Sequence, residues 1–380
     1  TINADGSVVV AAADATKMQI VSGNLTASGT ASVGVSGAVS VITKTTESYV
    51  GQNASVTGRG LRNALTVKAG DFAIGYGGSS AVTMDAPSES SRKLDGGSSA
   101  LFQIDQSITG HRTATPTTRS DFKGVAVTAV NQDDIGSGGV SGGASGTVSV
   151  NVAGSIHVLT AATRAHVDAS AKVNSAAGAT GAIQGVLIAA ANDYAHMGIA
   201  GAVAISGTVS VAPGVDVSVL NITTEAYVSD GAQVSAAGDI AVTARAAEDL
   251  VSMAVGAAAS GTVSVGGAVP VNTLTTTTRA FIGESASSYG AGAKASAGGN
   301  ILVSATDDTD FDVIAGSLGI GIGAAGVGAT VDVTVISKKT SAFVGTFATI
   351  DALGNGSAGL AVFDGSSTCS FASGFKGLAV

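Results

Sequence analysis

The feature that most constrains this chain is an internal repeat of nearly constant length. A strand-like motif, written GDIAVTA at residues 238–244, has six counterparts elsewhere in the sequence. The first apolar residues of the seven copies are Val8, Leu65, Val125, Val186, Ile240, Ile301 and Leu360. Their spacing stays within roughly 54–61 residues, and a fixed period of this kind indicates a stacked repeat protein, in which each module buries one side against its neighbours.

Two further motifs recur inside the modules at a constant separation. A glycine that opens a short Val- and Ser-rich segment occurs at Gly29, Gly146, Gly207, Gly261 and Gly323. An aromatic or histidine residue follows each of these glycines at one fixed offset, giving Tyr49, His166, Tyr227, Phe281 and Phe343. Because His166 takes the place of Tyr or Phe, we expect it to be a packed ring. Each module of roughly 54–61 residues therefore divides into segments of about 20 residues.

The pattern inside these segments favours β-structure over helix. Valines alternate with other residues at Val263 and Val265 and again at Val269 and Val271, which places one side of each strand inward. Abundant glycine and valine oppose helix. The sequence predicts an all-β fold, a right-handed parallel β-helix with rungs of about 20 residues and three rungs per module. Roughly 19 such rungs would form a rod on the order of 90 Å long. Residues 1–380 are expected to form one solenoid of six to seven modules with an irregular insertion near 85–121.

Composition excludes several classes of protein. The chain has 54 glycines, 4 prolines and no tryptophan, and 45% of its residues are hydrophobic, which is typical neither of disorder nor of a pocket lined by large side chains. The net charge of −9 argues against partners such as nucleic acid or anionic membrane surfaces. The single cysteine, Cys369, has no partner for an internal disulfide. The charge-free stretches 250–271 and 313–331 are long enough to span a bilayer, but their Gly, Ala and Ser content argues against a membrane span.

The repeats resemble those of a known family. GAAASGTVSVGGAVPVNTLTTTTRAFIG (256–283) and DVIAGSLGIGIGAAGVGATVDVTVISKKTSAFVG (312–345) are similar to the repeats of giant bacterial β-strand-repeat surface exoproteins, the leukotoxin-type filamentous adhesins. The resemblance covers nearly all of the chain except 85–121. It implies a secreted, right-handed β-helical stalk, and the start at Thr1 without a signal peptide fits a mature or excised fragment.

Acidic or amide residues follow the first motif of every module. They are Asp14, Asp71, Asp133 with Asp134, Asn192 with Asp193, Glu248 with Asp249, Asp307 with Asp308, and Asp364. One interpretation is a ladder of calcium sites, and the other is turns capped by Asp and Asn side chains. One such position per module is too sparse for a calcium cage, so turn capping is favoured. A single calcium ion near Asp307, where Asp308, Asp310 and Asp312 are close in sequence, remains the alternative cofactor.

Threonine clusters suggest a different binding surface. They lie at Thr45 and Thr46, Thr223 and Thr224, 275–278, and Thr340. Regular threonine arrays on flat β-helices can bind ice, which requires threonine on every rung, about 4.8 Å apart. With three rungs per module the clusters would return only about every 14 Å, so solvent-facing threonines without a ligand are favoured.

An enzyme is the remaining alternative, because polysaccharide lyases and hydrolases also use β-helices. The insertion near 85–121 interrupts the repeat and would carry any site, through Arg92, Lys93, Asp95, Asp105, His111 and Arg112. A solvated insertion is the simpler interpretation. No Ser–His–Asp order, HExxH motif or phosphate-binding loop is present, so no catalytic, cofactor-binding or metal-binding residue is assigned.

The sequence thus predicts a structural, adhesive extracellular protein, not an enzyme. It is expected to act at the bacterial cell surface as a stalk or filament subunit. Its expected partners are further copies of itself, joined end to end or laterally into fibres, and a host or cell-surface ligand. The alternatives are a carbohydrate-active enzyme on the same fold and a calcium-binding solenoid.

Overall fold

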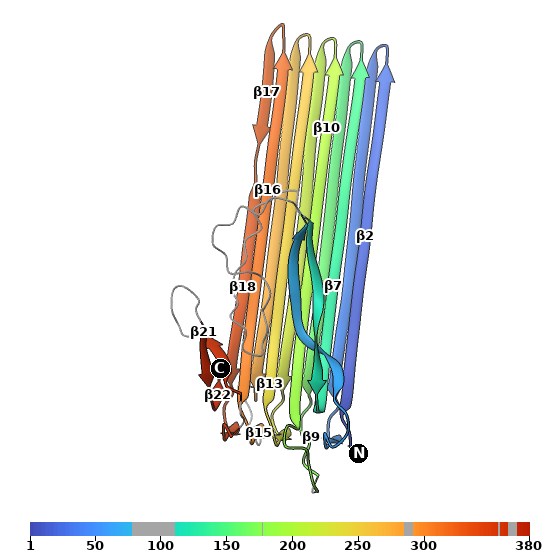
Figure 1. The fold of residues 1–380 in the computed structure, drawn as a ribbon. Coiled ribbons are helices and arrows are strands. Elements are labelled where there is room, and N and C mark those ends of the chain that lie inside the picture. The colour runs from blue at the N-terminus through green and yellow to red at the C-terminus, as the bar shows by residue number, and fades with distance from the viewer. Residues whose placement is uncertain (78–110, 177, 285–291, 356–357, 364–370) are drawn as a thin grey trace.

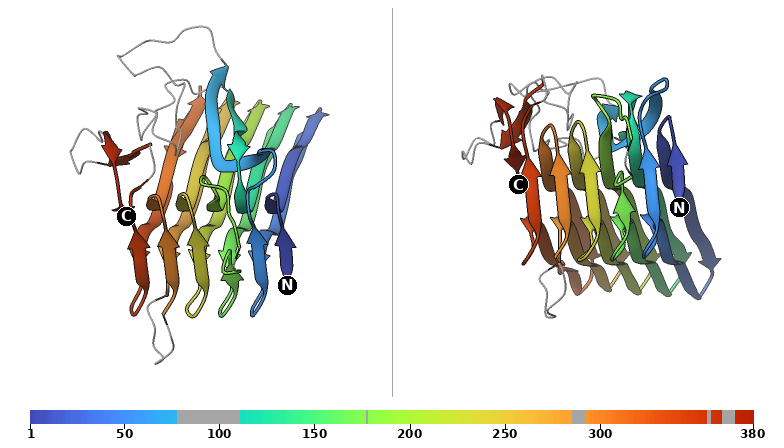
Figure 2. Two further views of the ribbon diagram at one scale, coloured as in Figure 1. Left: turned by 60° about the horizontal axis from the view of Figure 1, so that its bottom comes forward. Right: turned by 90° about the horizontal axis from the view of Figure 1, so that it is seen from below.

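The computed structural model describes residues 1–77, 111–176, 178–284, 292–355, 358–363 and 371–380. Within these ranges the chain is built almost entirely of strands, most of which form two long sheets and one short sheet, with two hairpins beside them (Figures 1 and 2). Cys369 and Asp364 lie outside the described residues, as do Arg92, Lys93, Asp95 and Asp105.

Each of the two long sheets contains five long strand positions. The first sheet contains β2 (Val8–Ser28), β7 (Gly124–Ser145), β10 (Gly185–Ser206), β13 (Ile240–Ser260) and β16 (Ile301–Gly321), with β22 (Leu378–Ala379) added beside β16. The second contains β3 (Ala31–Val50), β8 (Val148–Val167), β11 (Val209–Val228) and β14 (Val263–Ile282), and its last place is shared by β17 (Ala325–Thr330) and β18 (Val333–Val344).

A short sheet connects the two long sheets at one end of the long strands, at the bottom of Figure 1. It consists of β1 (Ile2–Ala4), β4 (Ser55–Gly58), β9 (Lys172–Val173), β12 (Gln233–Ala236), β15 (Lys294–Ala297) and β19 (Thr349–Ala352). All neighbours within the three sheets are parallel. The predicted parallel β-helix is therefore confirmed.

The rung of this β-helix is one whole module, not one of its shorter segments. Val125, Val186, Ile240 and Ile301 are register partners in one column, so these consecutive rungs are each separated by one full module. Val8 is the partner of Val125 in the same column and lies two modules before it in the chain. The predicted segment length is correct, but it is the length of one strand, as in the 20 residues of β3. The prediction of three rungs per module is wrong, because the turns inside a module join strands of different sheets.

The dimensions of the molecule change accordingly. A strand of about 20 residues is roughly 65 Å long, whereas five rungs stacked at about 4.8 Å span only about 25 Å. The expected rod, about 90 Å long along the stacking axis, is therefore wrong for this chain. The long dimension runs along the strands instead (Figure 1).

Two of the seven repeat copies do not form rungs. The copy at Leu65 begins β5 (Leu65–Gly77), which pairs antiparallel with β6 (His111–Phe122) as a hairpin, and β2 pairs directly with β7. The hairpin lies over the outer side of the first sheet (Figure 1). It packs there through Phe72 and Phe122, and a buried ion pair of 2.6 Å joins Asp71 to Arg245. The copy at Leu360 forms β20 (Leu360–Phe363), paired with β21 (Phe371–Phe375), and Leu378 takes its place beside Ile301.

The interior changes character along the strands. Next to the short sheet, valine, isoleucine and alanine side chains from all three sheets form a conventional apolar core that includes Val127, Ile188 and Val228. Toward the opposite end, where two-residue turns join the long strands, the interior is lined by Ser, Ala and Gly. There the two sheets approach closely, and serine hydroxyls bond across the gap, as in Ser137–Ser155 at 2.7 Å. Small side chains permit this spacing because nothing larger separates the backbones.

The described part of the chain holds no helix with the length and hydropathy of a bilayer-crossing segment. The charge-free stretches 250–271 and 313–331 lie in strands for most of their length.

Candidate functional site

The second sheet presents its apolar side chains to the outside. In β14 the alternating serine, alanine and asparagine residues Ser264, Ala268 and Asn272 are buried, whereas Val265 points outward and is 37% exposed. The same arrangement holds in β3, where Val33 is 68% exposed and Val41 is 70% exposed. The valines therefore form an outer surface of the β-helix and not its core.

These side chains line up across the rungs into one continuous surface, which we call the valine face. Val33, Val150, Val211, Val265 and Val327 are register partners, and a second column contains Val39, Ile156, Val217, Val271 and Val333. The remaining members are Val35, Val41, Val148, Val152, Val158, Val209, Val215, Val219, Val263, Val269, Val331 and Val335. Among these described columns no charged side chain projects outward, and the strands beneath them run nearly straight (Figure 1).

The valine face is far larger than an ordinary exposed apolar patch. About ten residues of strand length, at about 3.3 Å each, and five strands, about 4.8 Å apart, give an area of roughly 800 Å². The largest patch on a typical monomer is about 300–600 Å², and larger ones mark interaction sites. The outer side of the first sheet also exposes apolar side chains, among them Val21, Leu25 and Ile205, so both long sheets present apolar surface.

Two threonine columns border the valine face. Because one module forms one rung, the clusters return on every rung at about 4.8 Å, and the repeat of about 14 Å expected from the sequence is wrong. The outward columns are nevertheless interrupted, since Ala162, Asn221 and Lys339 take threonine places. The uninterrupted column, Thr46, Thr163, Thr224, Thr278 and Thr340, points inward. The threonines therefore do not form the regular outer array that ice binding requires.

A ladder of alternating charge follows the threonines. Glu47, Arg164, Glu225 and Arg279 occupy successive rungs of one outward column. Arg164 Nε lies 3.1 Å and Arg279 Nη1 3.3 Å from carboxylate oxygens of Glu225. Alternation is what a parallel, in-register stack requires, because identical charges on neighbouring strands would repel each other.

An aromatic column ends the same face. The rings of Tyr49, His166, Tyr227, Phe281 and Phe343 stack with centroid separations of 5.2, 4.7, 4.8 and 5.0 Å and nearly parallel planes. His166 is a packed ring, as predicted from its place in the repeat. The constant offset between the opening glycine of each segment and this ring therefore correctly predicted which residues lie next to each other on neighbouring strands.

The acidic positions predicted as turns lie in the middle of long strands. Asp14, Asn131, Asn192 and Asp307 fall in one interior register column, and Thr16, Asp133, Tyr194, Glu248 and Thr309 in the next. The turn-capping interpretation is wrong for Asp14, Asp133, Asn192, Glu248 and Asp307, because the strands continue through them. They form a buried polar seam between the two long sheets.

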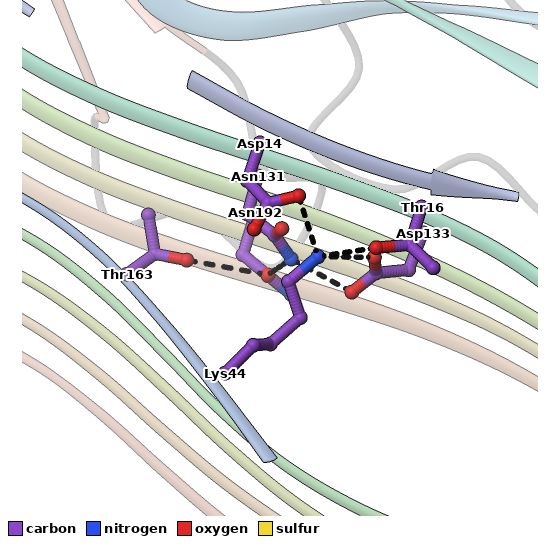
Figure 3. Close-up of polar contacts among 7 residues, drawn as sticks. All are labelled: Asp14, Thr16, Lys44, Asn131, Asp133, Thr163 and Asn192. Atoms are coloured by element: carbon purple, nitrogen blue, oxygen red, sulfur yellow. Dashed lines mark hydrogen bonds and ion pairs between the residues drawn. The ribbon is translucent and has the colours of Figure 1, made fainter. Parts of the chain in front are cut away.

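At the first rung the seam contains a lysine whose side chain is only 10% exposed. Lys44 reaches across from β3, and its Nζ lies 2.7 Å from Asp133 Oδ1, 3.1 Å from Asp14 Oδ1 and 2.8 Å from Thr16 Oγ1 (Figure 3). Asn131 donates a hydrogen bond of 2.8 Å to Asp133 Oδ2. The Asp133 side chain is fully buried, so the ammonium group supplies the compensation that a buried carboxylate requires. The pairing was not visible in the sequence, because Lys44 and Asp133 belong to different repeat copies.

Two stacked histidines continue the seam into the next rungs. The rings of His157 and His196 lie 4.3 Å apart, and the Tyr194 hydroxyl lies 2.7 Å from His157 Nε2. Burial lowers the pKa of His157 to about 4, against the opposing effect of the Asp133 charge. Burial, together with the neighbouring His157, lowers the pKa of His196 to about 3. Both rings are therefore neutral hydrogen-bonding groups near neutral pH.

Because both histidines resist protonation in the folded chain, we expect the free energy of unfolding to fall in acid. In the unfolded chain the histidines bind protons below about pH 6.5, whereas in the folded chain they resist protonation because their pKa values are lowered to about 4 and about 3. Stability therefore falls as the pH drops through this window, by about 3 kcal/mol or more at about 1.4 kcal/mol per pKa unit. Urea unfolding of the wild type and of the double variant His157→Gln, His196→Gln at pH 7 and pH 4.5 measures the effect.

The double variant separates the histidines from other buried groups. Burial raises the pKa of Asp216 and that of Glu248, which opposes the histidine effect, but both carboxyls are present in both proteins. The double variant should lose less stability between the two pH values than the wild type does. An equal loss in the two proteins would contradict the assignment.

The acidic run at 307–312 does not form a calcium cage. Asp307 points inward, where its Oδ1 lies 2.7 Å from Lys338 Nζ, and strand alternation places Asp308, Asp310 and Asp312 on the opposite side of β16. Among the described residues, no group of three or more His, Cys, Asp and Glu side chains is arranged to hold a metal ion.

Of the insertion near 85–121, only residues 111–121 are among the described residues. His111 and Arg112 belong to the backbone of β6, and their side chains lie outside the described set. A groove beside the hairpin is lined by Phe122, Leu187, Asp121 and Asp239 among others. Its carboxylates are engaged, because Asp121 accepts a hydrogen bond from the Arg119 side chain and Asp239 accepts one from the backbone N–H of Asn300. Nothing among the described residues of this groove favours a catalytic pair.

Comparison with protein families, with characterised proteins and with solved structures finds no match to this chain.

Proposed function

We propose that this chain is a structural element, a segment of a β-helical stalk or filament that associates side by side with a second copy of itself through the valine face. The observation that carries the proposal is the size of that face, about 800 Å² without a charge. Two such faces in contact would bury about 1,600 Å² in total, which is the size of a standard stable protein interface.

The charge ladder favours a second copy as the occupant. When the second copy is turned so that its strands run in the same direction and its rung order is reversed, Glu47 faces Arg279 and Arg164 faces Glu225. Every pair in the four-rung ladder then joins opposite charges. The same operation sets the outward valines of the first and fourth rungs, and of the second and third, opposite each other. This is an isologous two-fold interface, the commonest symmetry of protein dimers. Over the four matched rungs it still buries about 1,300 Å².

Growth along the stacking axis fits the same role. In the described part of the chain β3 has β8 as its one strand neighbour, so backbone groups on its other edge are free to pair with another rung of the same register. The resemblance of the repeats to those of giant bacterial exoproteins supports a place for such a scaffold at the bacterial cell surface, outside the cell.

The test is a single charge in the centre of the valine face. Val217→Lys should weaken self-association at least about 100-fold, because an unpaired ammonium group buried between two apolar faces costs several kcal/mol. Sedimentation velocity over a range of protein concentrations measures the association. Val21→Lys is the matched control, since Val21 is an exposed valine on the outer side of the other long sheet.

Lateral pairing also predicts how the wild-type protein behaves in solution. It must associate reversibly in solution, and Val21→Lys must associate as the wild type does. A wild-type protein that stays monomeric at high concentration would refute lateral pairing. Circular dichroism melting curves of both variants separate a loss of association from a loss of fold.

A further inference from the structure

The last rung of the described stack contains a lysine and an aspartate in direct contact across the seam. Lys338 comes from β18 and Asp307 from β16, so the two belong to opposite long sheets. Lys338 Nζ lies 2.7 Å from Asp307 Oδ1, and the Asp307 side chain is fully buried. Because Oδ1 is bonded to Cγ, this ion pair brings the amine nitrogen and the carboxyl carbon into proximity, which favours a reaction between them.

Two hydroxyl groups hold the other oxygen of Asp307. Thr276 Oγ1 and Thr278 Oγ1, both on β14, donate hydrogen bonds of 2.9 and 3.0 Å to Oδ2. These donors fix the orientation of the carboxyl group. They also point at the oxygen that would gain negative charge if a nucleophile added to Cγ, as donors in an oxyanion hole do.

A buried carboxylic acid completes the cluster. Glu248 on β13 is fully buried, accepts a hydrogen bond of 2.7 Å from Thr309, and its carboxyl group lies near that of Asp307. Burial, and then the nearby charge of Asp307, raises the pKa of Glu248 well above its usual range. The raised pKa favours the protonated form of Glu248, and a carboxylic acid in this position can exchange a proton with Asp307.

We propose that Lys338 and Asp307 condense into an intramolecular isopeptide bond, with Glu248 relaying the proton. A proton passes from the ammonium group to the carboxylate, and the neutral amine then adds to Cγ. The Cγ–Oδ1 bond breaks as the Nζ–Cγ bond forms, and Oδ1 leaves as water with two of the three ammonium protons. The amide and one water account for every atom of the ion pair, so no oxidant, metal or other reactant is required.

Two other lysine–aspartate ion pairs among the described residues lack part of this arrangement of buried carboxylate, hydroxyl donors and buried carboxylic acid. At the first rung Lys44 contacts buried Asp133, but the second oxygen of Asp133 accepts a hydrogen bond from the side-chain amide of Asn131. The other carboxyl group on Lys44, that of Asp14, is 40% exposed and not buried as Glu248 is. Lys17 and Asp134 pair at 2.9 Å on the surface, where water competes. These two pairs serve as internal controls within the same polypeptide.

The bond would join the two long sheets at the end of the described stack. There β18 is paired with β14 on one side, and its other edge has no strand neighbour among the described residues. Strands at such an edge open most readily. A covalent link through the interior would prevent β16 and β18 from separating, which suits a scaffold under load, although the chemistry does not depend on lateral pairing.

Mass spectrometry of the folded, purified chain tests the proposal directly. The intact mass should be lower than the sequence mass by one water. After digestion, the peptides that contain Lys338 and Asp307 should appear as one branched species. Lys338→Arg, which keeps the charge but removes the nucleophilic amine, should restore the full mass. Lys44→Arg should leave the mass deficit unchanged.

Glu248→Gln distinguishes a positioned reaction from a passive contact. It keeps the shape of the side chain but cannot relay a proton, so the folded variant should show the full mass or form the bond at least about 10-fold more slowly after refolding. A folded wild-type protein with the full sequence mass and separate Lys338 and Asp307 peptides would overturn the proposal. Bond formation at an unchanged rate in Glu248→Gln would remove Glu248 from the mechanism.

Discussion

Replacing Lys44 with methionine is expected to lower the free energy of unfolding by about 3–5 kcal/mol, because it leaves a buried carboxylate without its partner. Lys44 Nζ contacts Asp133, whose side chain is fully buried, and it also contacts Asp14. Methionine has a similar length and fills the space, so the loss reports on charge and not on a cavity. Urea denaturation followed by circular dichroism measures the change.

The same rung supplies a matched control. Lys17 lies on the outer side of β2 and pairs with Asp134 at 2.9 Å, with 74% of the lysine side chain exposed. Exposed ion pairs contribute about 1 kcal/mol or less, so Lys17→Met should have little effect. Equal losses in the two variants would show that burial of the seam does not govern the energetics.

Gly256→Ala should destabilise the fold by about 3 kcal/mol or more, because it forces the two long sheets apart. An added Cβ at Gly256 would lie 2.1 Å from the carbonyl oxygen of Gly267 and 2.2 Å from that of Ala212. Both obstacles are backbone atoms that belong to hydrogen-bonded strands, so neither can rotate away as a side chain would. Separation of the sheets would also weaken the contacts of the neighbouring rungs.

Gly201→Ala is the control for this prediction. Gly201 lies on β10, and an added Cβ there meets no atom within 4 Å. Since alanine restricts the unfolded chain more than glycine does, this variant should be as stable as the wild type or slightly more stable. Thermal melts of the two variants should therefore differ clearly, and a similar melting temperature for both would contradict the close approach of the sheets.

The register of the fold could be read from the sequence. In a parallel, in-register stack, equivalent residues occupy equivalent places, so the period of the sequence is the period of the structure. The column Val8, Val125, Val186, Ile240 and Ile301 and the stacked rings at Tyr49, His166 and Tyr227 follow from the spacing alone. The fold class was predictable for the same reason.

The size of the rung could not be read in this way. A segment of about 20 residues is compatible either with a complete small rung or with one long straight strand, and the period is the same in both cases. What decides between them is where the chain turns. The interior glycines of these segments lie within extended strands, where they permit close approach of the sheets, and do not mark turns.

The contacts within the polar clusters of the seam also could not be predicted from the sequence. Lys44 meets Asp133 because the module near Leu65 forms a hairpin outside the stack, so that β2 pairs directly with β7. Lys338 meets Asp307 because β16 and β18 face each other across the interior. The sequence marks these residues as polar positions within strands of alternating character. Their partners depend on which strands become neighbours, and that is settled only in three dimensions.

The sequence by itself determined an all-β stack, its period and the residues that share each column. Only the tertiary structure decided which side of the alternating strands is buried. Alternation defines two faces of a strand but does not say which of them is buried. The usual expectation that the more apolar face is buried would place the valines of β14 inside and expose Ser264 and Ala268. The structure does the opposite, because only small side chains let two sheets come together at backbone distance, where serine hydroxyls can satisfy each other. The valines are left outside on every rung, and that produces the surface on which the proposed function rests.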